Sequence, residues 1–416
     1  MKDDSIDISE ISTKRLPLRI VLFVVALAVA VGAFTIGVKK LGGNEAGYAT
    51  VSARADGDAP LYAANFRLTY NFDGGSRAIR VQKNELSDAY SDALARLYKL
   101  LDAEKEYPGY EGSLAELNRR PNQDVALPQE LFDILCDALE RTERGEGYSV
   151  YDAPLRTEWN RIAYAADAED FDPLHDADEA ERLRAVAAQC ADRGNCRLEI
   201  VDADQRIVRL IVSESYLDFL REYELPRIML DLRQMKDAYL LRGVAEALDQ
   251  RGFADGFLNT LGGLTVSLPG KIEGQYVIYS YVNKRGEAAA EIPIAPGSAS
   301  AAFNAFPTTQ DAGYYTADGH TRCASRPEIT GEEAPIRSAF VLRRDGDIVE
   351  AAWEALRCFL WTDVPECAET AGDLLVYSLA DDDGMSLYAF GKEREQIVQK
   401  DGFRLIFVDG IINETM

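Results

Sequence analysis

Basic residues, histidine and cysteine are scarce in this chain of 416 residues, and each shortage argues against a class of function. Lys and Arg number 45 against 70 Asp and Glu, which leaves a net charge of −25. A chain this acidic is repelled by phosphate backbones and anionic lipid headgroups, so we expect no binding to nucleic acid and no basic membrane-binding face. The only two histidines, His175 and His320, make a metal centre built from several histidines unavailable.

Three common enzyme signatures are also missing. The sequence has no GxSxG elbow, no phosphate-binding loop ending in Gly-Lys-Ser/Thr, and no GxGxxG after a predicted strand. These absences argue against hydrolase triads and ordinary nucleotide-loop enzymes. Apolar residues nevertheless make up 47% of the chain, which is typical of a globular protein with a full hydrophobic core.

The N-terminal region carries the only long apolar run. Residues 20–38 read IVLFVVALAVAVGAFTIGV, nineteen residues without a charge, which is about the length needed to span a bilayer as a helix. We interpret this run as one transmembrane anchor after a short cytoplasmic tail at 1–19. Basic residues flank it on both sides and favour this orientation only weakly. A cleaved signal peptide is the alternative.

The charge is divided unevenly between this end and the rest of the chain. Residues 1–40 hold six basic and four acidic side chains, a balance of +2, so the remainder carries −27. Residues 39–60 are rich in Gly, Ala, Asp and Ser and are predicted to be a linker. A single domain at 61–416 would then lie outside the cytoplasm.

All six cysteines follow the apolar run, an even count that fits an oxidising compartment. Cys190 and Cys196 bracket a short turn-like sequence, and Cys358 and Cys367 bracket FLWTDVPE, so each pair is a candidate disulfide. Buried free thiols are the alternative, because connectivity cannot be read from sequence. No CxxC is present, which argues against a redox dithiol or a zinc knuckle.

The pattern of elements predicts an α+β fold. Apolar periodicity predicts helices from Glu85 onward and at 128–143, 237–251 and 348–358. Alternation predicts two strands at 65–72 and 76–81 around an Asp-Gly-Gly turn, and further strands at 196–201, 207–212, 277–282, 339–343, 374–379, 386–389 and 403–408. The acidic run at 165–181 is predicted to be a solvated loop that leads into a helix. Helices and strands do not alternate regularly, so a doubly wound sheet is not expected.

Several short segments occur in an order that one known family shares. They are Thr69-Tyr70, the helix end LYKLLDAEKEY, SLAELN at 113–118, the stretch at 125–159, and GFADGFLNTLGGLTVSLPG at 252–270. In this order the chain resembles the ApbE-like FAD:protein FMN transferases. These extracytoplasmic enzymes split FAD and attach FMN through a phosphoester to a Thr or Ser of a partner protein. The resemblance implies the fold of that family, preceded here by one transmembrane helix.

The resemblance implies a set of cofactor-binding residues. Asn259, Gly262 and Gly263 match the family's Asn-x-Gly-Gly turn, where the glycines let backbone N–H groups approach a flavin or phosphate. Asn118 ends the family's Ser-rich loop. Asp231 and Lys236 match the family's Asp-Leu-Gly-x-Ile-Ala-Lys-Gly, although both glycines are replaced and one residue is deleted.

The family's metal ligands are replaced by two glutamates. In the family, an Asp and a Thr one helical turn apart bind Mg²⁺, and Glu350 and Glu354 stand at those positions here. Carboxylates at i and i+4 share a helix face and could hold Mg²⁺, which prefers hard oxygen ligands. An exposed acidic helix face is the alternative. The family's histidine strand resembles residues 324–331 but has Ala324 at the histidine position, and no catalytic residue is assigned.

Three functions are compatible with these features. The first is Mg²⁺-dependent transfer of FMN from FAD to a Thr or Ser of an extracytoplasmic acceptor protein, with release of AMP. The second is a non-catalytic flavin-binding or adaptor protein on the same fold. The third is a disulfide-bonded interaction domain that binds no flavin.

Overall fold

The computed structural model of the protein describes residues 46–54, 62–145, 148–270, 276–279, 290–293, 295–304, 314–317, 320–323, 336–360, 373–379, 386–392, 397–399 and 403–408. Among these residues, no helix combines the length and the apolar character that a membrane crossing requires. The predicted anchor at 20–38 lies outside the described residues.

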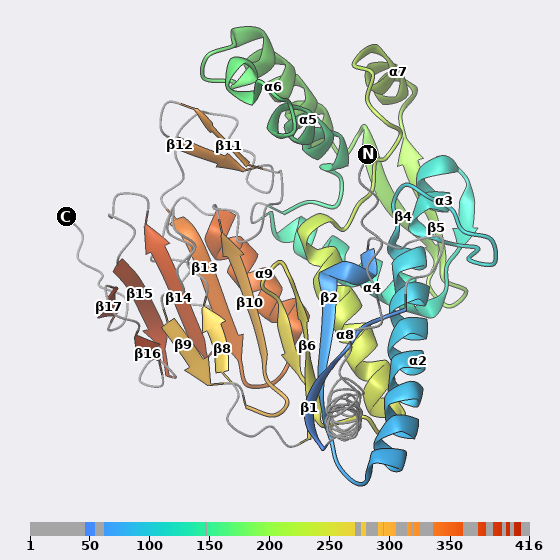
Figure 1. Ribbon diagram of the computed structural model, residues 1–416. Helices are drawn as coiled ribbons and strands as arrows, with labels where there is room; N and C mark the ends of the chain where they lie inside the picture. Colours follow the sequence, from blue (N-terminus) through green and yellow to red (C-terminus); the bar gives the residue numbers. More distant parts are fainter. Residues whose placement is uncertain are drawn as a thin grey trace, which may run out of the picture.

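Helices and strands are intermixed, as an α+β fold requires (Figure 1). The helices are α2 Ser76–Leu101, α3 Leu114–Arg119, α4 Gln129–Arg144, α5 Ala153–Ala163, α6 Ala177–Ala191, α7 Glu214–Glu222, α8 Lys236–Gln250 and α9 Ile348–Leu360, with short 3₁₀ turns η3 Tyr62–Asn65, η4 Ala168–Phe171 and η5 Arg233–Met235. The strands are β1 Gly47–Val51, β2 Phe66–Phe72, β3 Asp124–Ala126, β4 Cys196–Asp202, β5 Ile207–Val212, β6 Gly256–Thr260, β7 Thr265–Ser267, β8 Tyr276–Tyr279, β9 Ala290–Pro293, β10 Ala299–Asn304, β11 Tyr314–Ala317, β12 His320–Cys323, β13 Ile336–Arg343, β14 Leu374–Leu379, β15 Ser386–Gly391, β16 Val398–Gln399 and β17 Arg404–Phe407.

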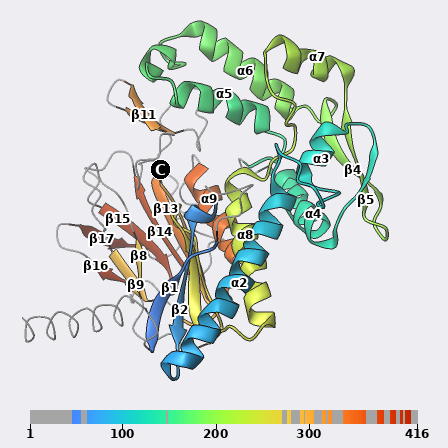
Figure 2. The same ribbon diagram turned by 45° about the vertical axis from the view of Figure 1, so that its right-hand side comes forward.

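A nine-stranded sheet forms the centre of the molecule. Its strand order is β1-β2-β6-β7-β10-β13-β14-β15-β17, and its pairs are antiparallel except for β15 with β17. Helices α8 and α9 pack on this sheet, and α2 packs against α8 (Figure 2). The small sheet β16-β9-β8 lies near the other face of β13 and β14 (Figure 1).

Strand β13 shows how the layers are held together. Seven of its eight residues are buried, so both of its faces are covered. Ala339 and Val341 belong to the core shared with α9, whereas Phe340 and Leu342 belong to a second core with β9, β14 and β15. This alternation is the period of two that a strand imposes. The predicted strand at 339–343 is therefore confirmed, and it begins three residues earlier.

Residues 76–81 form the first turns of α2, so the strand predicted there is wrong. Strand alternation would put Ile79 and Val81 on one face, but Ile79 is fully buried and Val81 is 49% exposed. Ile79 instead shares a buried stripe with Leu86 and Tyr90, at the spacing of a helix. The helical period therefore extends upstream of Glu85, where the sequence pattern placed the helix start.

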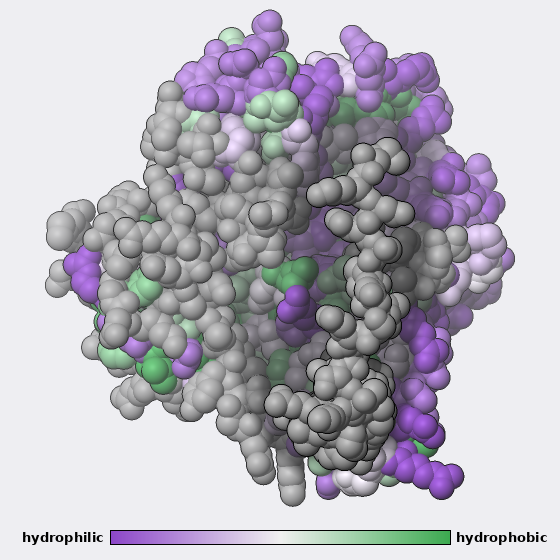
Figure 3. Space-filling view, in the orientation of Figure 1, coloured by the Kyte–Doolittle hydropathy of each residue, from purple (hydrophilic) through white to green (hydrophobic). Residues whose placement is uncertain are grey.

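The chain between α2 and α8 forms a lobe above the sheet. It contains α3 to α7 and the three-stranded sheet β3-β5-β4. The buried carboxylate of Glu158 on α5 accepts hydrogen bonds from Arg161 and from Arg182 on α6, which joins these two helices. Hydrophilic side chains predominate on the visible surface of α6 and α7 (Figure 3). The predicted acidic loop is confirmed in this lobe as η4 followed by α6.

The remaining predicted elements are largely confirmed. Helices α4, α8 and α9 lie within one or two residues of their predicted bounds. Strands β4, β5, β14, β15 and β17 occupy their predicted positions, and β8 covers the first part of the strand predicted at 277–282.

One of the two predicted disulfides, Cys190 with Cys196, is wrong. Cys190, at the end of α6, and Cys196, at the start of β4, are free thiols. Both are buried in the core, and the sulfur of Cys190 lies 3.7 Å from the Tyr216 hydroxyl. Burial raises the pKa of the Cys190 thiol to about 11 and that of Cys196 to about 12. Cys358 is buried in α9, whereas Cys367 lies outside the described residues, so that pairing stays a prediction.

Candidate functional site

The loop at 231–236, which ends at the first residue of α8, contains two of the predicted site residues, Asp231 and Lys236. The backbone N–H of Asp231 donates to the Val150 carbonyl at 2.9 Å, and its carboxylate accepts the backbone N–H of Arg233 at 3.2 Å. Arg233 has φ +53°, in the left-handed region that favours glycine. It stands at the first of the two positions where the family that the sequence resembles has glycine, and its φ is one that glycine adopts easily.

The side chain of Arg233 is buried, with only 4% of its surface exposed. Its Nη1 donates to the Asp152 carboxylate at 3.1 Å. Its Nε and Nη2 atoms are buried and have no hydrogen-bond partner in the described part of the chain. Burial raises the pKa of Asp152, and the charge of Arg233 acts in the opposite direction. The loop therefore holds a buried guanidinium that pairs with Asp152 through Nη1 and, among the described residues, has no acceptor for Nε and Nη2.

Lys236 and Asp237 lie at the other end of this loop. The Lys236 ammonium lies 4.6 Å from the centre of the Tyr98 ring on α2, a cation–π distance. Burial opposes ionisation of the nearby Asp102, but hydrogen bonds from two backbone N–H groups and the Tyr107 hydroxyl, together with the Lys236 charge, lower its pKa. The Asp237 carboxylate accepts the Asn65 amide at 2.8 Å.

The predicted Gly-Gly turn joins β6 to β7 in a hairpin. Gly263 has φ +100°, and a Cβ there would lie 3.0 Å from the Ala302 carbonyl oxygen of β10, so glycine is needed for both reasons. Asn259, half-buried on β6, pairs in register with Arg67 and Thr265. The turn is therefore first of all a structural hairpin of the central sheet.

Asn65 connects this hairpin to the loop. Its carbonyl accepts the backbone N–H of Leu261, in the turn, at 2.9 Å, while its side chain donates to Asp237. Leu261 is exposed, as is Gly262, and a Cβ on Gly262 would meet only the Thr260 hydroxyl, at 3.7 Å. The structure thus brings the Gly-Gly turn and the start of α8 to the same end of the sheet.

Asn118 has a structural role that the resemblance did not indicate. Its amide nitrogen donates to the carbonyls of Ala103 and Leu230, and its oxygen accepts the backbone N–H groups of Met229 and Leu230, all within 3.0 Å. The side chain is buried, and both ends of the amide are used. Asn118 therefore fixes the segment before Asp231, while its role in binding a cofactor stays a prediction.

Glu350 and Glu354 lie on α9, as predicted, but each is paired with an arginine. The Glu350 carboxylate lies 2.9 Å from Arg141 Nη1, and Glu354 accepts a hydrogen bond of 2.7 Å from Arg343 Nη1. Within the described ranges, no three His, Cys, Asp or Glu side chains converge as a metal site would require. The donor set at α9 is therefore two carboxylates with guanidinium partners, which does not fit a Mg²⁺ ion.

Arg141, on α4, is the centre of this arrangement. Its Nε and Nη2 donate to the Asp137 carboxylate, which also accepts the Tyr239 hydroxyl at 2.6 Å, and its guanidinium lies 5.5 Å from the Trp353 ring of α9. Burial opposes the charge of Arg141, but the hydrogen bonds and charge of Asp137, with the charge of Glu350, raise its pKa. Arg141 therefore stays charged.

Arg141, Asp137, Glu350 and Trp353 form what we call the arginine cluster. Tyr148 connects this cluster to the loop at 231–236. The Tyr148 hydroxyl donates to the Leu232 carbonyl at 3.0 Å, and its ring meets Trp353 edge-on at 5.6 Å. Sequence reasoning missed Arg141 and Tyr148 because nothing in their local pattern marks them, although both lie in the segment at 125–159 that carries the resemblance.

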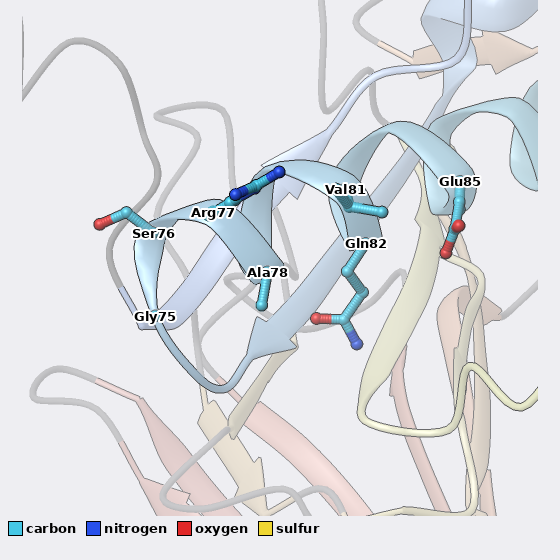
Figure 4. Close-up of a pocket in the computed structure, with 7 residues that line it drawn as sticks. All are labelled: Gly75, Ser76, Arg77, Ala78, Val81, Gln82 and Glu85. Atoms are coloured by element: carbon cyan, nitrogen blue, oxygen red, sulfur yellow. The ribbon is translucent and has the colours of Figure 1, made fainter.

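One surface hollow is separate from this cluster. It has a volume of about 780 Å³ and lies along the first turns of α2 (Figure 4). Its lining residues are Gly75, Ser76, Arg77, Ala78, Val81, Gln82 and Glu85. None of them belongs to the loop at 231–236 or to the arginine cluster, and no function is assigned to the hollow.

Comparison with known proteins identifies the fold. No protein-family model matches the chain, and no curated protein matches it in sequence. Solved structures are similar: an ApbE protein from Thermotoga maritima (16% identity, TM-score 0.55, covering 80% of this chain and 94% of that one) and the flavin transferase ApbE from Vibrio cholerae (15%, 0.56, 85% and 100%). A third is the apo flavinyl transferase ApbE from Pseudomonas stutzeri (11%, 0.51, 86% and 95%). The chain therefore has the fold of the ApbE flavin transferases, which confirms the expected α+β fold, while the transmembrane helix expected before it stays a prediction.

Proposed function

We propose that the protein binds FAD as a divergent relative of the flavin transferases and transfers FMN from it to an acceptor protein. The observation that carries the proposal is the shared fold, which extends over 80% or more of this chain and nearly all of each similar structure. The order of the sequence segments supports it independently. The acceptor would be an extracytoplasmic protein with a Thr or Ser, reached by a domain tethered through residues 20–38.

The proposed reaction requires positioning and charge neutralisation more than covalent chemistry from the protein. The acceptor hydroxyl oxygen forms a bond to the FMN-side phosphorus of FAD, the bond to the bridging oxygen breaks, and AMP leaves. The hydroxyl proton is released. We assign no side chain as the base that takes it.

The loop at 231–236 offers two cations for an anionic ligand. Two buried nitrogens of Arg233, Nε and Nη2, have no hydrogen-bond partner among the described residues, and buried N–H groups are costly unless they find an acceptor. Lys236 lies over the Tyr98 ring at the other end of the loop. We propose that the FAD pyrophosphate is recognised from this loop, and that the Gly-Gly turn, held next to it by Asn65, borders the flavin.

A second candidate function is flavin binding without transfer. The specific observation that favours it is the pairing of Glu350 with Arg141 and of Glu354 with Arg343, which occupies both carboxylates of α9 with guanidinium partners. Transfer would then lack the charge that a metal supplies, whereas binding through the loop at 231–236 would remain.

One experiment separates these candidates. The full-length protein is incubated with FAD and a peptide that carries a Thr acceptor, in Mg²⁺ and in EDTA, and flavin retention, AMP and flavinylated peptide are measured. AMP with flavinylated peptide supports transfer, and retained flavin without AMP supports binding alone. A protein that retains no flavin would contradict both and favour an interaction domain.

Two variants test the loop assignment. Lys236→Gln removes the charge over the Tyr98 ring and is expected to weaken FAD binding about tenfold, since a charge-assisted contact contributes on the order of 1.4 kcal/mol or more. Lys83→Gln, on α2 and outside the loop, is the matched control and is expected to bind FAD normally. Equal affinities for the two variants would show that Lys236 does not face the ligand.

A further inference from the structure

The carboxylates of α9 are the part of the site that departs most from its expected chemistry. Mg²⁺ is bound by several oxygen ligands at about 2.0–2.1 Å in nearly octahedral geometry. Glu350 and Glu354 are suitably spaced to supply two of those ligands. Each instead contacts a guanidinium that comes from a different element, Arg141 from α4 and Arg343 from the end of β13.

Each arginine is anchored by a second carboxylate. Arg141 donates from its Nε and Nη2 edge to Asp137, one turn earlier on α4, while its Nη1 faces Glu350. Arg343 holds Asp345 in the same way and presents Nη1 to Glu354. The hydrogen bonds that Arg343 donates to Asp345, together with the charge of Glu354, raise the pKa of Arg343, so this cation is also fixed.

Burial makes the Arg141 contact hard to exchange for a metal ion. The Arg141 side chain is 7% exposed and lies against the Trp353 ring. Pulling Glu350 away toward a metal would leave this buried guanidinium with one carboxylate fewer, and breaking buried ion pairs is strongly unfavourable. We expect that cost to weaken Mg²⁺ binding at α9 about a hundredfold relative to an unpaired carboxylate.

We propose that Arg141 and Arg343 take the place of the divalent cation at α9, so that the protein binds no metal there. The two glutamates are then guanidinium partners. This role explains why both positions are acidic here, whereas the family that the sequence resembles has one acid and one hydroxyl. Arg141 also ties α9 to α4. A second consequence, which rests on the proposed function, is that FAD binds with the same affinity in Mg²⁺ and in EDTA.

The direct test is a Mn²⁺ titration of the full-length protein without FAD. Electron paramagnetic resonance measures the free ion at each step of the titration. We expect the wild type to show no site tighter than about 1 mM, the weak end of protein divalent-cation sites. Glu350→Gln is expected to leave the titration unchanged and to lower the midpoint of thermal unfolding equally in EDTA and in Mg²⁺. Glu140→Gln, which breaks the exposed pair with Arg144 on α4, is the matched control and should change neither measurement.

Replacing Arg141 tests whether removal of the guanidinium allows a metal ion to bind at α9. Arg141→Gln leaves Asp137 and Glu350 facing the same space without a cation, so Mg²⁺ is expected to raise the unfolding midpoint of this variant and not that of the wild type. The proposal is wrong if the wild type binds Mn²⁺ saturably and Glu350→Gln weakens that binding tenfold. It is also contradicted if Arg141→Gln folds but gains no stability from Mg²⁺.

FAD affinity distinguishes this proposal from the proposed function. Equal dissociation constants in Mg²⁺ and in EDTA, within about twofold, support a metal-independent site. An affinity that Mg²⁺ raises tenfold in the wild type but not in Glu350→Gln overturns it. If FAD binds under neither condition, the proposed function fails, while the Mn²⁺ titration still decides whether the arginines stand where a metal would.

Discussion

Replacing Asp137 by asparagine tests the central ion pair through its dependence on pH. The Asp137 carboxylate accepts hydrogen bonds from Arg141 and from the Tyr239 hydroxyl, and so joins α4 to α8. Asparagine has nearly the same size and retains one acceptor oxygen. The substitution therefore removes the charge and one acceptor, and it leaves the packing almost unchanged.

The expected loss of stability follows from the burial of the two partners. Removing one partner of a fully buried pair costs about 3–5 kcal/mol. Asp137 is 30% exposed, and Arg141 keeps its contact with Glu350, so both the desolvation and the unpaired charge are smaller here. We therefore expect Asp137→Asn to lower the free energy of unfolding by about 2 kcal/mol at pH 7.

The pKa of Asp137 determines how this loss changes with pH. Burial opposes ionisation, but hydrogen bonds from Arg141 and Tyr239 outweigh it and lower the pKa below that of an ordinary aspartate. A carboxyl group with a lowered pKa in the folded state stabilises the protein above its unfolded pKa, and this contribution disappears as the pH falls through the folded value. The difference between wild type and variant should therefore be constant above about pH 5 and shrink below about pH 4.

Urea unfolding at a series of pH values measures both effects. The midpoint is expected to shift without a change in the slope of free energy against denaturant, because the exposed surface is the same. Asp133→Asn, exposed and one turn earlier on α4, is the matched control and should be neutral at every pH. A variant as stable as the wild type at pH 7, or a loss that persists undiminished at pH 3.5, would refute the argument.

Three further substitutions test the neighbouring structure. Gly263→Ala is expected to cost about 2 kcal/mol in urea unfolding, because it combines a positive φ with a Cβ 3.0 Å from a β10 carbonyl oxygen, whereas Gly262→Ala should cost less than half as much. Asn118→Ala is expected to cost about 3 kcal/mol, because it leaves buried backbone groups without partners; loss of FAD affinity with unchanged stability would contradict this structural role. Glu158→Gln should cost about 3 kcal/mol and increase hydrogen exchange in α6, because it breaks the buried pair with Arg182; unchanged exchange would count against this pair as the joint.

Local patterns predicted the elements of this fold better than its arrangement. Helix α9 could be located because its apolar residues recur at helical spacing, and the strand at 374–379 because it is a short apolar run between turns. The start of α2 was misassigned because SRAIRV alternates over six residues, a length at which strand and helix patterns are easily confused. The neighbours in the central sheet were beyond prediction, because β2 pairs with β6 nearly two hundred residues later.

The candidate site was predictable as positions but not as interactions. The spacing of Glu350 and Glu354 correctly placed both on α9, one turn apart. Whether such a pair binds a metal depends on which cation the fold brings to it, and Arg141 lies 209 residues away in sequence. A carboxylate pattern has the same appearance in either case, so the metal prediction could not be decided without the tertiary contact.

Arg233 holds a backbone conformation that glycine adopts more easily. A left-handed φ costs a non-glycine residue roughly 1–2 kcal/mol, so the conformation persists only where its surroundings impose it. Here the Tyr148 hydroxyl holds the Leu232 carbonyl, and the Asp152 carboxylate holds the Arg233 side chain. The backbone path is therefore set by these neighbours, whose contacts offset the strain of a left-handed arginine.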